Sequence, residues 1–424
     1  MNRSKAQERR GARPPLSKAR VLTLAGLVLG VLASFILTVQ VSVAGAFRDR
    51  QPQVALRWVP WDAYARARLA ASLVTNQQSP EAQNVASKLA HEAILRDALT
   101  PAAVRALASA KVSDRGEGGL SLALMTEAQR LSRRDQATQI WFIERNLRQG
   151  RMEDALEHFD IAARSSVEVR DVLFPLMGSV LSEPRLYRAM TERLSGKPVW
   201  SIPFLQHLAS SGSEMAPTVR LVSTFLDPVR SDERSIIATL LQRLASLRQY
   251  RLAWDLYSSS GLAHEAKGAP GSLVDGSFET NSGAEPFAWT LVQEGDLWAT
   301  SSITPAKRGR VLEVGASSGR RGEVARQLVH LQPGRYELRA EFGAVAEDEF
   351  ERPELRVLCA SEDADELLLS VRPQSGAERI SSEGRFNVTA NCPFQWVSIR
   401  VGGEGAPRDS MTWIDDVALT RVTS

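Results

Sequence analysis

The stretch Gly276-Ser277-Phe278-Glu279 opens a C-terminal region that closes with Trp413-Ile414-Asp415-Asp416-Val417. Between these stretches, short runs that alternate apolar and polar residues are separated by glycines. In one turn, Pro333-Gly334, proline and glycine occupy the positions that a type II turn favours, and a run starting at Tyr336 follows. Many short strands with such turn signals predict an antiparallel β-sandwich.

The pattern changes near residues 263–271, before which apolar residues recur with helical spacing. Helices followed by strands, without strict alternation, indicate separate domains. We therefore expect a helical domain over residues 51–262, a linker over 263–271 and a sandwich over 272–424. The predicted fold class is multidomain α plus β.

Trp289 follows Glu279 by ten residues. Together with the two stretches quoted above, it gives residues 272–422 a pattern that resembles the jelly-roll sandwiches of carbohydrate-binding modules. The resemblance implies that the first and last elements meet at a structural calcium ion. Its ligands would be the carboxylate of Glu279, that of Asp415 or Asp416, and the backbone carbonyl of Ser277. Calcium takes such oxygen ligands in a flexible shell. The alternative is that these carboxylates cap turns without a metal.

Binding of a sugar in such a module requires aromatic platforms on its surface. Trp289 and Trp396 occupy positions similar to the core aromatics of the family, and we expect them to pack between the sheets. Trp298 and Trp413 are the candidates for carbohydrate contact. Tryptophan side chains in a sandwich are more often buried than exposed.

The N-terminal region combines a basic tail, residues 1–20, with a run, residues 21–46, that contains no charged side chain. This run is long enough for a transmembrane helix, which needs roughly 20 apolar residues. Basic flanks stay in the cytoplasm, so we expect the bulk of the chain in the periplasm, anchored in a bacterial inner membrane. A cleaved signal peptide is the alternative, because Ala44-Gly45-Ala46 matches a cleavage site.

The basic composition comes from the tail. The whole chain has 52 basic and 49 acidic residues, whereas the part after the tail has 45 and 48, a formal charge of −3. A nucleic-acid partner is therefore not expected.

The helical region contains a repeat with a period of 34 residues. Its first copy has Gly116, Ser121, Met125 and Ala128, which recur as Gly150, Ala155, Phe159 and Ala162. This period and these residue types resemble tetratricopeptide repeats. The resemblance implies an α-solenoid that holds a protein partner on its concave surface. A rigid spacer is the alternative.

The chain has two cysteines, Cys359 and Cys392, both in the predicted sandwich. An exported compartment permits a disulfide between neighbouring strands. The sequence alone does not establish whether their Cα atoms come close enough.

The sequence shows no catalytic motif of the metalloprotease, phosphate-loop or Gly-x-Ser-x-Gly type. We therefore expect a non-enzymatic, membrane-anchored envelope protein, whose architecture resembles accessory proteins of bacterial exopolysaccharide synthesis and export. It would scaffold such an assembly through a protein partner and contact polysaccharide through the jelly roll. The alternatives are a purely protein-binding scaffold and, more remotely, a glycoside-active enzyme.

Overall fold

The chain forms two compact units, Met1–Ser166 and Val167–Ser424, in a computed structural model. Most of the predicted basic tail and of the predicted linker, and Gly116 of the repeat, lie outside the described residues. The structure describes residues 18–76, 79–111, 119–265, 273–280, 283–293, 295–303, 309–317, 319–376, 379–403 and 411–422.

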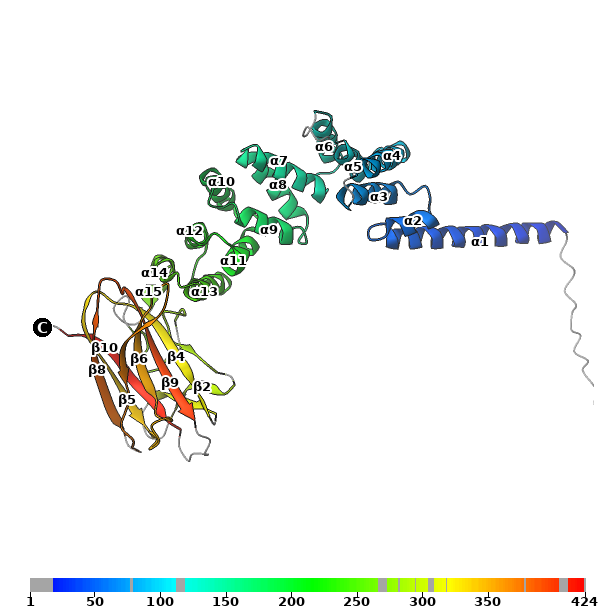
Figure 1. The fold of residues 1–424 in the computed structure, drawn as a ribbon. Coiled ribbons are helices and arrows are strands. Elements are labelled where there is room, and N and C mark those ends of the chain that lie inside the picture. Colours follow the sequence, from blue (N-terminus) through cyan, green and yellow to red (C-terminus); the bar gives the residue numbers. More distant parts are fainter. Residues whose placement is uncertain are drawn as a thin grey trace, which may run out of the picture. The chain divides into compact units, whose positions relative to one another are not determined.

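The first unit begins with helix α1, Lys18–Phe47 (Figure 1). Its segment Gly26–Phe47, 22 residues long, is apolar enough to cross a bilayer, although a signal sequence has the same properties. Near the end of α1, Ala44 is buried in a small cluster with Ala55 of helix α2 (Pro52–Trp58), Val59 and Ala65. The end of the apolar helix is therefore part of the packed helical unit.

The helices that follow in the first unit start at residues suited to a helix N-terminus. The Ser79 side chain accepts a hydrogen bond from the backbone N–H of Ala82 (3.1 Å), and Asp135 accepts one from Thr138 (3.2 Å). Alanines form much of the core, which allows close helix contacts. These helices are α3 (Ala63–Asn76), α4 (Pro80–Arg96), α5 (Pro101–Ala110), α6 (Gly119–Leu131), α7 (Gln136–Arg148) and α8 (Met152–Ser165).

The described positions of the predicted repeat are all buried or sit in a turn. Gly150 has a φ of +70° in the turn between α7 and α8, a conformation that favours glycine. The other positions point into the helical core: Ser121, Met125 and Ala128 of α6, and Ala155, Phe159 and Ala162 of α8. The helical character of this region is confirmed. The tetratricopeptide assignment stays a prediction.

The helices of the second unit have larger core side chains, among them Trp200 and Phe204, which meet edge to face. Arg243 donates hydrogen bonds to the carbonyls of Leu208 and Gly212 at the C-terminal end of a neighbouring helix, where the Leu208 carbonyl also accepts one from the Gly212 N–H. The helices are α9 (Arg170–Gly178), α10 (Pro184–Ser195), α11 (Ser201–Ser211), α12 (Met215–Phe225), α13 (Ser231–Ser246), α14 (Tyr250–Ser259) and α15 (Leu262–Glu265).

Two antiparallel five-stranded sheets complete the second unit as a jelly-roll sandwich (Figure 1). One sheet has the order β1-β4-β9-β6-β7, and the other has the order β2-β3-β10-β5-β8. The strands are β1 (Thr290–Leu291), β2 (Leu297–Ile303), β3 (Arg310–Ala316), β4 (Arg320–His330), β5 (Gly334–Gly343), β6 (Glu354–Cys359), β7 (Glu366–Val371), β8 (Ile380–Val388), β9 (Phe394–Gly403) and β10 (Trp413–Arg421).

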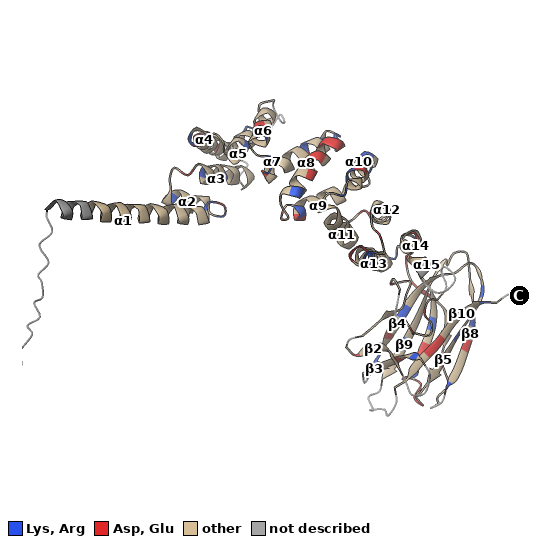
Figure 2. Cartoon of the chain, turned by 180° about the vertical axis from the view of Figure 1, so that it is seen from behind, with Lys and Arg blue, Asp and Glu red and all other residues tan. Residues whose placement is uncertain are grey.

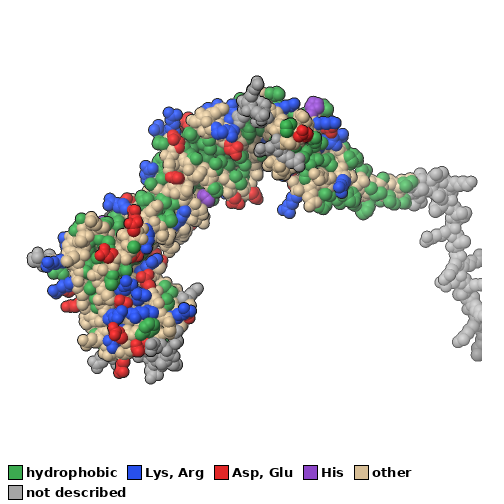
Figure 3. All heavy atoms as spheres, viewed as in Figure 1, with side chains coloured by type: hydrophobic (Ala, Val, Ile, Leu, Met, Phe, Trp, Pro, Cys, Tyr) green, Lys and Arg blue, Asp and Glu red, His purple; other side chains and the backbone are tan. Residues whose placement is uncertain are grey.

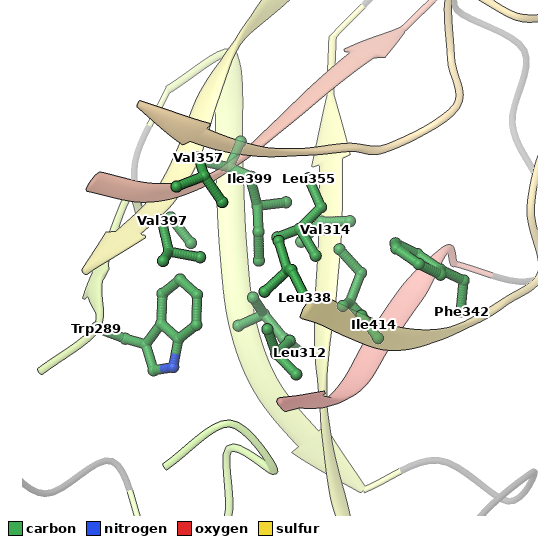
Figure 4. Packing of buried hydrophobic residues seen from close by; sticks show 14 of the residues in the cluster. Trp289, Leu312, Val314, Leu338, Phe342, Leu355, Val357, Val397, Ile399 and Ile414 are labelled. Atoms are coloured by element: carbon green, nitrogen blue, oxygen red, sulfur yellow. The ribbon is translucent and has the colours of Figure 1, made fainter. Parts of the chain in front are cut away.

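Branched aliphatic side chains from both sheets meet in the core, with Trp289 among them (Figure 4). The prediction for Trp289 is confirmed. The prediction for Trp396 is wrong, because its neighbours Val397 and Ile399 point into this core and Trp396 therefore points to the outer face of its sheet. It is nevertheless only 5% exposed, since helices cover it from outside.

The structure contains the disulfide Cys359–Cys392, with the two Cα atoms 5.6 Å apart. Cys359 ends β6, and Cys392 precedes β9, its neighbour in the sheet. The pairing that the sequence left open is thus present, and it joins two adjacent strands near the covered end of this sheet.

Candidate functional site

The first and last elements of the sandwich meet, as the resemblance implied. The Val417 N–H donates a hydrogen bond to the Gly276 carbonyl (2.9 Å), and a side chain at Gly276 would collide with the Val417 carbonyl. Phe278 is buried in the core and packs on Trp289, with ring centroids 5.3 Å apart. Glycine is therefore required at position 276, because the backbone of Val417 comes so close. Phe278 holds this first element of the sandwich against the core.

The carboxylates proposed as calcium ligands have protein partners in this structure. Glu279 accepts a hydrogen bond from the backbone N–H of Arg310 (2.9 Å), and Asp415, which is buried, accepts one from Asp416 (2.7 Å). Ser277 lies in the same turn as Glu279. In the described ranges, no three His, Cys, Asp or Glu residues are grouped as metal ligands. The calcium site remains a prediction.

Asp275 is the residue of this turn that the sequence reasoning did not single out. Its carboxylate accepts hydrogen bonds from the backbone N–H groups of Glu279 (3.0 Å) and Thr280 (3.2 Å). A cavity of about 50 Å³ lies next to it, lined also by Phe278, Glu285 and Trp289. Because one water needs roughly 10–15 Å³ of such space, this cavity admits water.

The two candidate carbohydrate platforms, Trp298 and Trp413, lie on the outer face of the sheet β2-β3-β10-β5-β8. Each ring covers a glycine of the neighbouring strand, Gly315 for Trp298 and Gly343 for Trp413. Trp298 is half-buried, but Trp413 is only 6% exposed. Trp413 therefore lacks the open ring face that a sugar platform needs. We call this outer face, with its strand residues Glu337, Glu341 and Arg385, the tryptophan face.

The opposite sheet, β1-β4-β9-β6-β7, carries two different regions on its outer face. One region is covered by helix α14. There Tyr250 contacts Trp396 edge to face, Trp254 lies 4.7 Å from His330, and Tyr257 stacks on Phe287 at 4.4 Å between ring centroids. We call this cluster the aromatic seam; it consists of Tyr250, Trp254, Tyr257, Phe287, His330, Phe394 and Trp396.

Polar contacts reinforce the aromatic seam at its edges. Arg248, in the turn before α14, donates hydrogen bonds to the Asp365 carboxylate (2.8 Å) and to the Ser361 carbonyl (2.9 Å). Gln242 of α13 donates one to Glu285 (3.0 Å). The last helices and the sandwich therefore share a mixed aromatic and polar contact.

The second region of this outer face is polar and not covered by α14. We call it the arginine face and define it by Glu323 and Arg326 of β4, Glu354 and Arg356 of β6, and Ser398 and Arg400 of β9. These residues alternate with core residues such as Leu355, Val357 and Ile399, so they share the outward side. Register places Glu323 and Glu354 on either side of Arg400, and Arg326 and Arg356 on either side of Ser398.

Two glutamates of the arginine face have pKa values shifted in opposite directions. Burial raises the pKa of Glu323, although the charges of Arg326, Arg356 and Arg400 act against it. Burial also acts to raise the pKa of Glu354, but the Ser370 hydrogen bond (2.7 Å) and nearby arginines outweigh it and lower that pKa.

Arg356 and Arg400 differ from the other arginines around this face. Arg321 and Arg372 both pair with Glu354, at 3.3 and 3.5 Å. Arg326 lies 3.7 Å from Glu323, and its guanidinium covers the Trp396 ring at 4.6 Å from the centroid. Among the described residues, Arg356 and Arg400 form no ion pair, and the buried Nε of Arg356 has no hydrogen-bond partner. The guanidinium groups of Arg356 and Arg400 are therefore not used in ion pairs among the described residues.

The sequence contained a signal for these arginines. In Glu354-Leu355-Arg356-Val357 and Val397-Ser398-Ile399-Arg400-Val401, every second residue is apolar and faces the core. The charged residues must then share the outer side of their strands. The sequence reasoning concentrated on tryptophans and did not use this alternation to find basic side chains.

Comparison with known proteins gives solved structures of similar fold for the C-terminal sandwich. No protein-family model and no curated protein matches the chain. A CBM4 structure has 16% identity and a TM-score of 0.27 and covers 36% of this chain and 100% of its own. TmCBM61 in complex with β-1,4-galactotriose has 15% identity and a TM-score of 0.26, covering 36% of this chain and 99% of its own.

A third structure contains the CBM22-1 and GH10 modules of Clostridium thermocellum endo-1,4-β-D-xylanase 10B, complexed with xylohexaose. It has 17% identity and a TM-score of 0.27, covering 36% of this chain and 29% of its own. The identities and TM-scores of all three structures are low, so these similarities assign no function to the chain.

Proposed function

We propose that this protein is a non-catalytic, membrane-anchored envelope protein that binds polysaccharide through its sandwich. Its helices would hold a protein partner of an exopolysaccharide synthesis or export assembly. The observation that carries the glycan-binding part is the arginine face, where Arg356 and Arg400 are half-buried and form no ion pair with a described residue. Such convergent polar groups orient a ligand.

The packing at the end of α1 supports an uncleaved anchor. Cleavage after Ala44-Gly45-Ala46 would remove Ala44 from its buried cluster with Ala55, Val59 and Ala65. Trp58 and Trp61, both about half exposed, follow the apolar segment, as aromatic residues do at a membrane interface. In the proposed orientation, protease added to spheroplasts should digest the bulk of the chain. Protection of the whole chain would contradict it.

The helical part supports a role in holding a protein. Helix-rich repeats of the tetratricopeptide kind present surfaces to protein partners. Large apolar side chains, Leu95, Leu99 and Leu120, are exposed on the first unit, and hydrophobic side chains are visible on the helices in Figure 3. A purified chain should retain a defined partner from solubilised envelopes, and a matched chain with Leu95 and Leu99 changed to serine should retain less.

Glycan binding is tested with the full chain in detergent, run through native gels that contain xylan, galactan, polygalacturonate or no polysaccharide. We expect at least one polysaccharide to retard it relative to an unrelated membrane protein of similar size. Equal mobility in all gels would remove glycan binding from the proposal. Release of reducing ends from any of these polysaccharides would contradict the non-catalytic role.

A protein-only scaffold is the second candidate. The observation that favours it is the burial of the aromatic residues: Trp413 is 6% exposed, and Trp396 lies in the aromatic seam. Neither ring presents an open platform for sugar stacking. In that case the sandwich would act as a rigid support for the helices, and the gels would show no retardation.

Calcium remains part of the proposal as a structural ion. The backbone contact between Gly276 and Val417 brings the two predicted elements together. The oxygens of Glu279, Asp415, Asp416 and the Ser277 carbonyl are of the type that calcium binds. The ion would hold the first element against the last strand.

A further inference from the structure

Arg356 and Arg400 are like charges placed on neighbouring strands of one sheet. Arg356 lies opposite Ser398, and Arg400 is the next outward residue of β9, which makes the two arginines diagonal neighbours. Such neighbours are about 7–8 Å apart, within reach of long side chains. Like charges at this spacing repel, and half-burial strengthens the effect. The fold gains nothing evident from this pair.

The surrounding charges neutralise the pair only in part. Glu323 and Glu354 lie directly across the strands from Arg400, but they form their ion pairs with Arg326, Arg321 and Arg372. Arg372 also pairs with Glu349 (3.1 Å), so three glutamates face five arginines. The outer face therefore carries an excess of positive charge over β4, β9 and β6, and Figure 3 shows blue basic side chains beside red acidic ones on the visible side of the sandwich.

We propose that the arginine face binds an anionic polysaccharide, by receiving its carboxylate groups between Arg356 and Arg400. This inference rests on the proposed function and names the class of glycan. A guanidinium binds a carboxylate through two parallel N–H donors, and neither Arg356 nor Arg400 uses its guanidinium in an ion pair with a described residue. A uronate group between the two arginines would remove their repulsion.

The extent of the face favours a polymer over a small anion. Arginines follow one another across three adjacent strands, which are about 4.8 Å apart. A chain with a charge on successive sugars can therefore contact several of them. At the other end of this sheet, α14 covers the outer face through the aromatic seam. On this sheet, the polymer can therefore bind only at the arginine face.

The test uses the full chain in detergent and two probes with the same backbone: polygalacturonate and its fully methyl-esterified form. Binding is measured by affinity electrophoresis at low and at physiological ionic strength. We expect the acid form to bind and the ester to bind at least tenfold more weakly. Added salt should weaken binding of the acid form, because exposed charges are screened. Polyglutamate serves as a non-carbohydrate polyanion.

Four variants locate the binding. Arg356→Gln and Arg400→Gln should each weaken binding of polygalacturonate about tenfold or more, since a charged hydrogen bond is lost. Arg339→Gln is the matched control, because it removes the same charge from an exposed position on the tryptophan face. Arg400→Lys keeps the charge without the forked donors and should bind weakly, which separates geometry from charge and guards against misfolding.

Each outcome is decisive. Equal binding of acid and ester, unaffected by Arg356→Gln and Arg400→Gln, overturns the anionic class but leaves glycan binding intact. An equal loss of polygalacturonate binding in Arg339→Gln overturns the placement of the site on the arginine face. Polyglutamate binding as tightly as polygalacturonate overturns the carbohydrate assignment. Binding of neither probe, with retardation by neutral xylan or galactan, overturns the inference alone, whereas no retardation by any polysaccharide also overturns the proposed function.

Discussion

The two outer faces of the sandwich differ in how their charged side chains pair. On the tryptophan face, Arg385 pairs with Glu337 directly across β5 and β8 (2.7 Å), and Arg379 pairs with Glu341. Figure 2 shows acidic and basic segments on this sheet. On the arginine face, Glu323 and Glu354 lie directly across from Arg400 but pair with other arginines, and Arg356 and Arg400 form no ion pair among the described residues. Each face belongs to its own five-stranded sheet.

This difference distinguishes charges that pair within the sheet from charges that a ligand could bind. Cross-strand pairs of opposite charge stabilise a sheet modestly, so the ion pairs of the tryptophan face need no ligand to explain them. An excess of half-buried guanidinium groups destabilises a sheet unless something binds it. Departures from local consistency of this kind are expected at functional sites. The arginine face is therefore the better place to look for a ligand.

The largest expected effect concerns the covered end of the arginine-bearing sheet. Trp396→Ala should cost about 3–5 kcal/mol of stability, because it removes a buried ring from the aromatic seam. Trp298→Ala, on the tryptophan face, should cost less than half as much, since Trp298 is half-buried. Equilibrium denaturation of the full chain measures the cost, and hydrogen exchange in α14 and β9 locates it. Equal costs would mean that the seam is not a tight contact.

Calcium should act on the tryptophan face, whose last strand carries Asp415 and Asp416. An ion that binds the folded state alone stabilises it by about 2.7 kcal/mol at 100 times its Kd. The full chain should therefore melt higher in calcium than in chelator. Glu279→Ala should remove most of the difference, and Glu383→Ala, at an exposed position on β8, should leave it unchanged. Identical melting in calcium and chelator would make Glu279 and Asp415 ordinary turn carboxylates.

The smallest expected effect is a dependence on pH at the aromatic seam. Burial, and then the charge of Arg251, lower the pKa of His330, against the opposing charge of Asp255. Between this lowered pKa and the unfolded value of about 6.5, the unfolded state binds more protons. Stability should thus fall as the pH falls below about 6.5.

The His330→Phe variant isolates that contribution, since His158 and His207 also have lowered pKa values. Between pH 7.5 and 5.5, the variant should lose less stability than the parent chain. Denaturation midpoints at three pH values give both slopes. If stability changes equally with pH in the parent chain and the variant, protonation of His330 does not affect the stability of the aromatic seam.

Much of the sandwich could be predicted from alternation and turns. The run that starts at Tyr336 is in strand β5, and Pro333-Gly334 leads directly into this strand. The two-residue strand β1 was not predicted. Neither were strand β2 and the first part of β8. Their outward positions, such as Thr300 in β2 and Ser381 and Glu383 in β8, are polar and resemble a loop. Pairing with β3 and β5 makes them strands.

The candidate site was less predictable than the fold. Trp298 and Trp413 share one face, yet the sequence did not show that Trp413 is buried. The position of Trp396 was predicted by family resemblance, although the alternation of Gln395, Val397 and Ile399 already placed it on the outer side. What covers that side, helix α14, comes from 146 residues earlier in the chain, counted from Tyr250 to Trp396.

By itself, the sequence determined the local properties of this protein: an apolar helix near the N-terminus, helices followed by strands, and the side of each strand that faces the core. These follow from spacing along the chain, because side chains alternate across a strand with period two. Tertiary structure alone decided which strands are neighbours. Register between β6 and β9 brings Arg356 beside Arg400, and α14 closes one end of their sheet. Such contacts join distant segments, so they depend on the packing of the whole unit.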